Sequence, residues 1–487
     1  MAAASPYDPR VRLWGASDAM QLRKARRGHS PVDDLVAAGT SAQPVLSLQD
    51  GARVAVVGGG PAGSFFAHFL LKMAAEVGLD VSVDIWEPRS FACTGPSGCN
   101  HCGGIVSESL VQILATEGIT LPLDVVQCGI ESYVIHMDVD SVRIASPAGE
   151  PRIAALYRGG GPRTGEATPS TSFDGFLQTM AVSDGARVVR SLVSGIEWRD
   201  GLPHLLEAGG ATSPYELVCI ASGVNSNFVG LLDQAGVEID PPETMRTYIC
   251  EFRSDPETIQ RLLGDSMHVF LLDIARLEFA ALIPKGEFVT MCLLGEDVDE
   301  ELVHEFLHAP EVRRCLPVDS TPCVCACSPL INVRGPSRPF ADRLVLIGDS
   351  GVTRLYKDGI GAAFRTAKAA AATAVFEGIS AEDFGRAYAP TCKAISADNA
   401  IGKFMFKSAH AFKHARFLRR AVARMSRHEQ ARPGSARRLS SVLWNMFTGS
   451  APYRQVLTDT LHPAFVAGMV WNLLVGAFPR RRAAKVA

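Results

Sequence analysis

The sequence predicts an α/β protein with three parts: a Rossmann-type nucleotide-binding domain, a substrate domain built on an antiparallel β-sheet, and a helical, basic C-terminal tail. Three observations indicate this. Residues 52–88 read as a glycine-rich βαβ unit, residues 129–146 and 267–295 alternate apolar and polar side chains, and Lys and Arg accumulate after residue 400. The hydrophobic content of 47% and the charged content of 20% are those of a globular protein.

The three parts are expected to draw on stretches that alternate along the chain, since the motifs of the nucleotide-binding domain are widely separated. The stretches are 1–50 (an N-terminal extension with one short helix near 18–27), 51–128, 160–240 and 335–400 (nucleotide-binding domain), 129–159 and 241–334 (substrate domain), and 401–487 (basic amphipathic tail). A chain of 487 residues is long enough for two or three domains with real cores.

A glycine-rich loop follows the first predicted strand, in the segment VAVVGGGPAGSFF. The pattern G-x-G-x-x-G lets the strand turn sharply into a helix, lets the backbone approach a pyrophosphate, and lets helix and strand pack closely. The helix start supplies N–H donors and the positive end of a dipole. The next strand ends in an acid that can accept hydrogen bonds from a ribose diol. The dinucleotide-binding residues predicted from this unit are Gly58, Gly60, Pro61, Ala62, Gly63 and Glu87.

A second such segment lies some 285 residues later, in RLVLIGDSGVTRLYKDGIGAAF. It resembles the second FAD motif of the para-hydroxybenzoate hydroxylase superfamily, and the two motifs together favour FAD over NAD. In that superfamily the aspartate holds the ribityl chain, and the helix start faces the flavin ring, where its dipole stabilises the anionic reduced form. By this resemblance, the residues expected at the ribityl chain and the ring are Gly348, Asp349, Gly359, Ile360 and Gly361.

Within that superfamily, CGGIVSESLVQILATEGITLPLDVV (102–126) and SFDGFLQTMAVSDGARVV (172–189) resemble segments of geranylgeranyl reductases. The resemblance covers residues 52–395. It implies that Cys102 lies beside the isoalloxazine ring as the catalytic acid, and that Gly103 and Gly104 let the backbone pass. It also implies an activity: reduction of C=C bonds in a prenyl, isoprenoid or other lipid substrate, by hydride transfer from flavin N5.

The residues themselves leave other readings of these cysteines open. Cys99 and Cys102, with His101 between them, can also form a redox dithiol or, together with Cys93, part of a metal site. Buried thiols without a role are a further alternative. For CVCAC (323–327), which alternates like a strand, three thiols without a chemical role are favoured. No metal site is predicted. The twelve cysteines form no small-domain framework, so we expect reduced thiols in a cytoplasmic protein.

Two departures from the superfamily limit the functional prediction. Ser222 stands where relatives that use NADPH carry an aspartate, so the electrons are expected from a ferredoxin or another donor. The loop before the second helix lacks a proline and holds Arg354 and Lys357, which are either cations near the flavin or a solvated pair. The alternatives to the reductase are an FAD-dependent monooxygenase, a quinone-linked flavoprotein, and a flavin-bearing electron-transfer subunit without activity of its own.

The tail carries most of the positive charge of the chain. Residues 401–487 hold sixteen Lys and Arg against Glu429 and Asp459, a net charge of +14, which leaves −17 for the other 400 residues. We expect peripheral attachment to an anionic membrane surface; a solvated helix packed on the body is the alternative. The last apolar run, 465–478, has 14 residues, fewer than the ~20 that cross a bilayer. No recognition motif accompanies the charge, so no nucleic-acid partner is expected.

Overall fold

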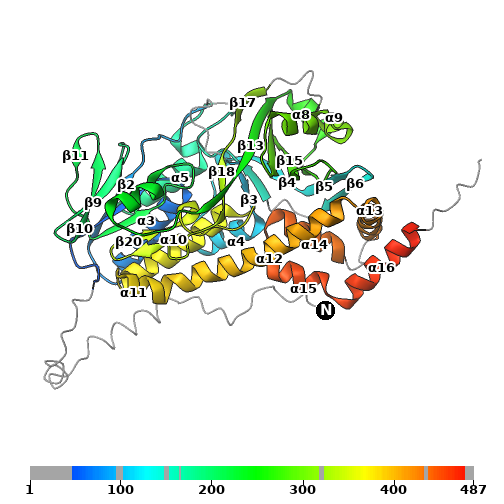
Figure 1. Cartoon of the computed structure of the whole chain (residues 1–487). Helices are drawn as coiled ribbons and strands as arrows, with labels where there is room; N and C mark the ends of the chain where they lie inside the picture. Colours follow the sequence, from blue (N-terminus) through cyan, green and yellow to red (C-terminus); the bar gives the residue numbers. More distant parts are fainter. Residues whose placement is uncertain are drawn as a thin grey trace, which may run out of the picture.

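The computed structural model describes residues 46–94, 102–146, 153–163, 166–316, 323–432 and 437–477. A six-stranded sheet has the order β19-β20-β12-β1-β2-β8, and its neighbouring strands run parallel except for the pair β19–β20 (Figure 1). Its strands span Ala52–Val57 (β1), Val81–Trp86 (β2), Arg187–Val189 (β8), Leu217–Ile220 (β12), Phe340–Ala341 (β19) and Leu344–Leu346 (β20). All of them come from the stretches expected to build the nucleotide-binding domain. The expected N-terminal helix lies outside the described residues.

The two faces of this sheet are buried by different layers, which explains the continuous apolar run of β1. Val54 and Val56 belong to a core with the helices on one face, whereas Ala55 and Val57 belong to a core on the other face. The helices are α3 (Pro61–Glu76), α5 (Phe173–Ser183) and α10 (Gly359–Phe376). The other layer consists of β9 (Gly195–Arg199), β10 (Leu202–Glu207), β11 (Gly210–Ala211), α6 (Phe228–Leu232) and the 3₁₀ turn η5 (Asp233–Ala235).

Helices α3 and α10 pack against each other along their length. Phe364 lies edge-on to Phe65 and Phe69, with ring centroids 5.3 and 5.2 Å apart. The contact face of α10 is otherwise built from alanines, which let two helices approach closely. The starts of both helices therefore lie near each other, although some 300 residues separate them in the sequence.

The substrate domain is built on a large sheet of order β17-β13-β16-β15-β14-β5-β6, with β18 also pairing with β13. Its strands are β5 (Ser132–Met137), β6 (Asp140–Ala145), β13 (Glu243–Arg253), β14 (Ser266–Phe270), β15 (Leu277–Lys285), β16 (Phe288–Gly295), β17 (Cys323–Cys327) and β18 (Leu330–Arg334). The expected antiparallel pairing holds except between β5 and β14, which run parallel. These two strands are separated by a long excursion through the nucleotide-binding domain, so no tight hairpin dictates their direction.

Different helices cover the two faces of this sheet. Helices α7 (Pro256–Leu262), α8 (Glu300–His308) and α9 (Pro310–Cys315) share a core with one face. The C-terminal helices share a core with the other face. A small sheet of β3 (Ile105–Val106), β7 (Ile153–Leu156) and β4 (Val126–Ile130), with α4 (Glu108–Thr116) and the 3₁₀ turns η3 (Leu123–Val125) and η4 (Pro169–Thr171), connects the two domains.

The chain after β20 is almost entirely helical. It runs through η7 (Gly348–Ser350), α10, α11 (Ala381–Asp383), a π-helical turn η8 (Phe384–Tyr388), α12 (Ala389–Lys413), α13 (Arg416–Gln430), α14 (Arg438–Thr448), α15 (Tyr453–Thr460) and α16 (Pro463–Ala477). Figure 1 shows α12 running along the molecule from the nucleotide-binding domain to the substrate domain, where α13 to α16 gather. Trp444 lies edge-on to Tyr133 of β5, with centroids 5.4 Å apart. The tail is thus part of the core.

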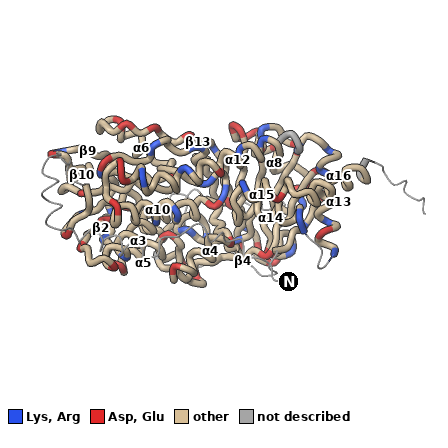
Figure 2. Tube along the Cα trace, turned by 90° about the horizontal axis from the view of Figure 1, so that it is seen from below, with Lys and Arg blue, Asp and Glu red and all other residues tan. Residues whose placement is uncertain are grey.

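Two of the five arginines of α13 pair with acidic groups of the same chain. Arg419, only 3% exposed, donates to Asp138 at 2.8 Å and lies 3.5 Å from Asp273. Arg427 pairs with Asp140, the first residue of β6. Figure 2 shows basic and acidic segments interleaved around α13. Part of the positive charge of the tail therefore has acidic partners in the body of the same molecule, besides any external partner.

We predict that Arg419→Met lowers the free energy of unfolding by about 2 kcal/mol, because it leaves two partly buried carboxylates without their cation. Arg424→Met is the matched control: Arg424 is exposed on the same helix, and its loss should change stability by less than about 0.5 kcal/mol. Chemical denaturation of both variants measures the difference. Equal effects would show that the ion pairs of α13 do not hold the tail to the sheet.

Candidate active site

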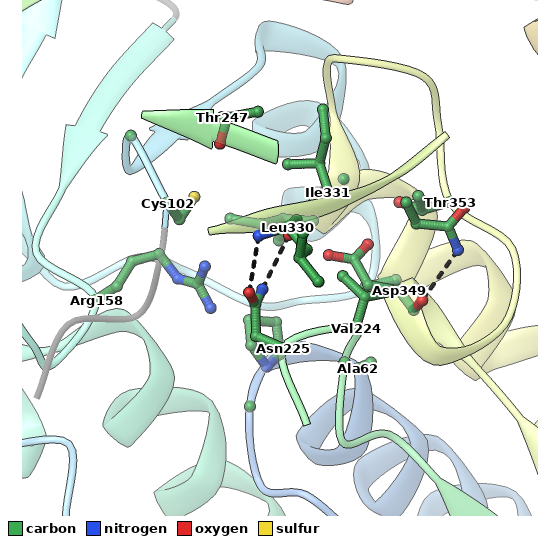
Figure 3. A pocket seen from close by; sticks show the side chains of 18 of the residues that line it. Ala62, Cys102, Arg158, Val224, Asn225, Thr247, Leu330, Ile331, Asp349 and Thr353 are labelled. Carbon is green, nitrogen blue, oxygen red and sulfur yellow. Dashed lines mark hydrogen bonds between the residues drawn. The ribbon is translucent and has the colours of Figure 1, made fainter. Parts of the chain in front are cut away.

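A cavity of about 840 Å³ lies where the two domains meet. It is bordered by the loop between β1 and α3, the end of β2, residues 102–107, the loop after β12, strands β13, β15 and β16, and the loop from β20 to α10. The carboxyl ends of the parallel strands point to it, which is where ligands bind in open α/β sheets. Figure 3 shows Cys102 and Arg158 on one side of this cavity and Asp349 and Thr353 on the other.

Most of the residues predicted from the sequence line this cavity. They are Gly58, Gly60, Pro61, Ala62, Glu87, Cys102, Gly103, Gly104, Asp349, Gly359 and Ile360. The three predicted glycines that do not line it, Gly63, Gly348 and Gly361, lie behind the wall where a side chain has no room. A Cβ on Gly63 would lie 1.9 Å from the carbonyl oxygen of Gly58, and one on Gly361 would lie 2.2 Å from Asp358 Oδ1.

The start of α3 opens directly onto the cavity. Gly58 has φ +105°, and a Cβ there would meet the carbonyl oxygen of Ala221 at 2.5 Å, so this turn requires glycine. Gly60 is different: its φ is −70°, and the nearest atom to a Cβ would be an Asp174 oxygen at 3.9 Å. The space before the backbone at Gly60 is therefore free for a ligand, and the first N–H groups of the helix face it.

Glu87 fixes this loop from the next strand. It is 3% exposed and accepts the N–H of Gly59 at 3.0 Å through Oε2. Its Oε1 accepts from the backbone and side chain of Arg89, at 3.0 and 3.1 Å. Arg89 Nη2 also donates to Oε2, at 3.5 Å, so a ligand hydroxyl would compete only with this long contact.

The β20–α10 segment meets the first loop through Gly348. Its φ is +57°, and a Cβ there would lie 2.8 Å from that of Ala62. The next residue, Asp349, lines the cavity, and burial raises the pKa of its carboxyl, although Thr353 and Arg158 act in the opposite direction. Asn332 donates to the carbonyl oxygen of Asp349 at 3.0 Å and holds the turn in place. The two glycine motifs are thus parts of one site.

The Cys-Gly-Gly stretch runs between the small sheet and the substrate sheet. Cys102 Sγ accepts the N–H of Gly104 at 3.3 Å, and Gly104 has φ +71°. A Cβ on Gly103 would lie 3.1 Å from Cys292 Sγ and 3.2 Å from Ile283 Cδ1, so the backbone passes against β15 and β16. Cys99 and His101, the other members of the possible dithiol or metal site, lie outside the described residues.

Sequence reasoning missed a buried ion pair beside Cys102. Arg158, after β7, donates to both carboxylate oxygens of Asp174 at 2.9 and 2.7 Å. Burial alone would lower the pKa of Arg158, but Asp174 and the Cys102 thiol raise it above its usual value, so it stays charged. Asp174 stands in the Phe-Asp helix start that supported the family resemblance, whereas Arg158 has no local signature. The pair places a fixed cation next to Cys102 (Figure 3).

Arg354 and Lys357 are not a solvated surface pair, because the C-terminal helices cover them: Arg354 is buried and Lys357 is partly buried. Arg354 donates to the carbonyl oxygens of Gly449 and Ala451, between α14 and α15. Lys357 donates to the carbonyl oxygen of Met446, and its Nζ lies 4.2 Å from the ring centre of Phe447. Desolvation lowers the pKa of Lys357 well below its usual value. Both side chains line the cavity.

The side of the cavity formed by the substrate domain is largely apolar. It is lined by Tyr133, Ile249, Met267, Phe279, Ala281, Ile283, Leu293 and Phe447. The loop after β12 closes another side: the Asn225 amide makes two hydrogen bonds of 2.9 Å to the backbone of Leu330, drawn as dashed lines in Figure 3. CVCAC forms β17, as expected, and Cys323 lies against Cys250, with 2.8 Å between the sulfur atoms.

No protein-family model matches the chain, and no curated protein sequence matches it. Solved structures match its fold. A geranylgeranyl bacteriochlorophyll reductase-like protein from Thermoplasma acidophilum aligns over 87% of this chain and 100% of its own, with 17% identity and a TM-score of 0.53. A flavoprotein/dehydrogenase from Cytophaga hutchinsonii covers 88% of this chain and 100% of its own (15%, TM-score 0.57). The halogenase PltM in complex with FAD covers 88% and 91% (14%, TM-score 0.55).

At these identities the likeness shows the fold. The predicted α/β class is confirmed, and the chain shares its fold with these solved structures.

Proposed function

We propose that this protein is an FAD-dependent oxidoreductase that reduces C=C bonds in a prenyl, isoprenoid or other lipid substrate. One observation carries the proposal: the two glycine motifs and the apolar wall of the substrate sheet border the same cavity. A cofactor held by the motifs would therefore face an apolar ligand held by the sheet, with Cys102 between them. FAD-bound and reductase-like proteins among the fold neighbours support this reading.

The residues present fit FAD. The free space in front of Gly60 would receive the pyrophosphate, and Glu87 would accept hydrogen bonds from the adenosine ribose. Asp349 would hold the ribityl chain, and the backbone at Gly359 and Ile360 would face the ring. Bound FAD would supply a two-electron carrier that accepts and delivers a hydride. The 18-residue helix α10 directs the positive end of its dipole toward this place and favours negative charge there.

Cys102 is the proposed acid. Its thiol would give a proton to the substrate carbon next to the one that receives the hydride. The guanidinium of Arg158 lies beside this sulfur and would stabilise the thiolate that remains. Asp174 keeps Arg158 oriented through two hydrogen bonds and so acts as a positioning residue.

The substrate class is inferred from the side chains that line the cavity. Aliphatic and aromatic side chains of the substrate sheet and Phe447 of α14 offer few hydrogen-bonding groups, which suits an apolar chain. A bound apolar chain would itself displace water from these walls, which suits hydride transfer. For the electron donor we propose a redox protein such as a ferredoxin, because Ser222 lies at the cavity where NADPH-dependent relatives carry an aspartate.

A second candidate is oxygen-dependent chemistry, because halogenases are among the fold neighbours. It differs from the reductase in one measurable way: it consumes oxygen, whereas the reductase turns over without it.

We further propose that α16 attaches the protein to an anionic membrane. Val466, Val470, Trp471 and Leu474 expose an apolar stripe at helical spacing, with Trp471 65% exposed. The neighbouring helix α13 exposes Arg416, Arg420 and Arg424. Among the described residues no helix is both long and apolar enough to span a bilayer, so the attachment would be interfacial. A lipid substrate would then be taken from the same surface.

We predict that Gly60→Val weakens FAD binding roughly 100-fold or more, because the new side chain occupies the proposed pyrophosphate position. The backbone angle and the open space at this residue tolerate a side chain, so the fold should survive. Titration of the apoprotein with FAD, followed by fluorescence, measures the effect. The control is Gly209→Val, at a turn with similar free space. Unchanged FAD affinity in Gly60→Val would contradict the assignment of the loop.

We predict that chemically reduced protein, kept anaerobic, converts unsaturated prenyl lipids to products two mass units heavier. Cys102→Ala should lower this turnover by about 10²- to 10⁴-fold, with FAD content unchanged, because it removes the proton donor. Cys128→Ala, which removes a thiol outside the cavity, is the control. Turnover that requires oxygen would favour the second candidate, and full activity in Cys102→Ala would remove the proposed role of this thiol.

We predict that the protein sediments with vesicles containing anionic phospholipid and is released as salt increases. The combined changes Val470→Ser, Trp471→Ser and Leu474→Ser should abolish sedimentation, because they remove the apolar stripe. Val182→Ser, an exposed apolar residue of α5, should leave it unchanged. Absence of binding by the unaltered protein would end the membrane proposal and leave the reductase proposal standing.

A further inference from the structure

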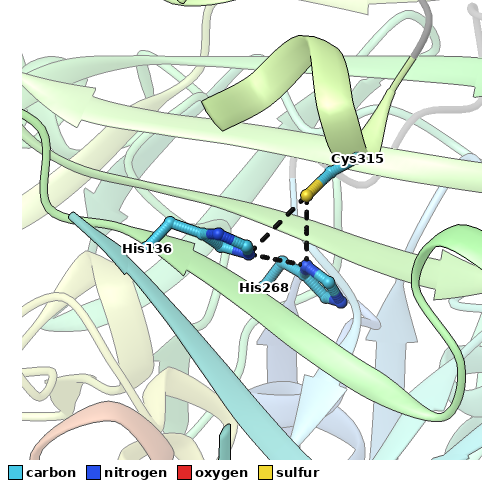
Figure 4. A group of neighbouring side chains, drawn as sticks. All are labelled: His136, His268 and Cys315. Atoms are coloured by element: carbon cyan, nitrogen blue, oxygen red, sulfur yellow. Dashed lines mark hydrogen bonds between the residues drawn. The ribbon is translucent and has the colours of Figure 1, made fainter. Parts of the chain in front are cut away.

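Outside the cavity, three metal-ligating side chains converge in the core of the substrate domain. His136 comes from β5, His268 from β14 and Cys315 from the end of α9 (Figure 4). Their exposed fractions are 7%, 5% and 6%. His136 Nε2 and His268 Nδ1 lie 2.8 Å apart, and Cys315 Sγ lies 3.6 and 3.5 Å from these two nitrogens. None of the three lines the cavity.

The second nitrogen of each imidazole is held by a hydrogen bond. His268 Nε2 lies 3.1 Å from the carbonyl oxygen of Leu263, which can only accept, so Nε2 carries the proton and Nδ1 presents its lone pair to the cluster. His136 Nδ1 lies 2.8 Å from Ser141 Oγ, which leaves Nε2 to face the cluster. Such outer hydrogen bonds are the ones that orient histidines bound to metals.

The surroundings of the three side chains are largely apolar. His136 stacks on Phe270, with centroids 4.6 Å apart, and Cys315 belongs to an apolar core with Phe306 and Val312. Apolar side chains would fill such positions at lower cost, because buried polar groups need partners. Two arginines near the cluster are engaged with other groups: Arg314 pairs with Glu311 at 3.2 Å, and Arg143 donates to Ser132 at 2.8 Å.

The distances fit one ion. Zinc–sulfur and zinc–nitrogen bonds of about 2.3 and 2.05 Å at a tetrahedral angle place a sulfur and a nitrogen ligand about 3.5 Å apart. Both sulfur–nitrogen distances of the cluster have this value within 0.1 Å. The two nitrogens would have to separate by about half an ångström, which small rotations of the two rings supply.

We propose that His136, His268 and Cys315 bind a Zn²⁺ ion. A thiolate and two imidazoles are ligands that zinc prefers, and a water molecule would complete the four-coordinate set. On binding, Cys315 loses its thiol proton to solvent and no electron is transferred. The ion joins α9 to two strands of the substrate sheet, so its role is to stabilise this domain, independently of the proposed reductase activity.

The test uses the full chain without an affinity tag, purified without chelators. We expect about one zinc per chain by mass spectrometric metal analysis. Chelation should lower the melting temperature, and added Zn²⁺ should restore it, a readout that needs no variant. Cobalt in place of zinc should give a thiolate-to-metal absorption band. Cys315→Ser and His136→Gln should each lower zinc affinity at least tenfold and, for Cys315→Ser, remove that band. Cys392→Ala, which removes a buried thiol of α12, is the control and should keep both.

Three results would overturn the proposal: copper instead of zinc in the purified protein, no zinc uptake by the chelated protein, or undiminished zinc in folded Cys315→Ser. Failure of the reductase assay has no bearing on these measurements, because metal content and melting temperature are read without substrate.

Discussion

The close contact between the starts of α3 and α10 is the constraint on which the site depends. Gly348 lets the end of β20 lie against Ala62, and Gly63 lets α3 lie against the strand that precedes it. Two segments far apart in the chain thereby open onto one cavity. A side chain at either glycine would push the helix starts apart, and the wall that the motifs share would no longer be continuous.

The other walls are supplied by parts of the chain that do not resemble any nucleotide-binding motif. The substrate sheet offers an apolar surface, and the small sheet brings Cys102 to its edge. The C-terminal helices hold the β20–α10 loop through the side chains of Arg354 and Lys357. Because the carbonyl groups that accept from these two side chains belong to α14 and the turn after it, the basic tail is a structural element of the site as well as a candidate membrane surface.

The sequence predicts those features of the fold and the site that depend on residues close together in the chain. The glycine spacing of residues 58–63 and the strand before it are dictated by steric rules that apply within a few residues, and the structure places them as those rules require. Arg158 could not be found this way, because its partner Asp174 becomes a neighbour only after α5 packs on the sheet. The burial of Lys357 depends on α14, some 90 residues later, and so looked like surface charge. His136, His268 and Cys315 have no short spacing: the pairing of β5 with β14 brings the histidines together, and the packing of α9 on the sheet adds Cys315.

The contact between the C-terminal tail and Arg354 joins parts of the chain that are synthesised at different times. The turn from Gly449 to Ala451, whose carbonyl oxygens accept hydrogen bonds from Arg354, is translated long after both glycine motifs. A nascent chain that folds its six-stranded sheet once β20 has emerged would do so while one wall of the cavity is still absent. Closure of that wall would then be a late step of folding, and before it a ligand would find the cavity open on that side.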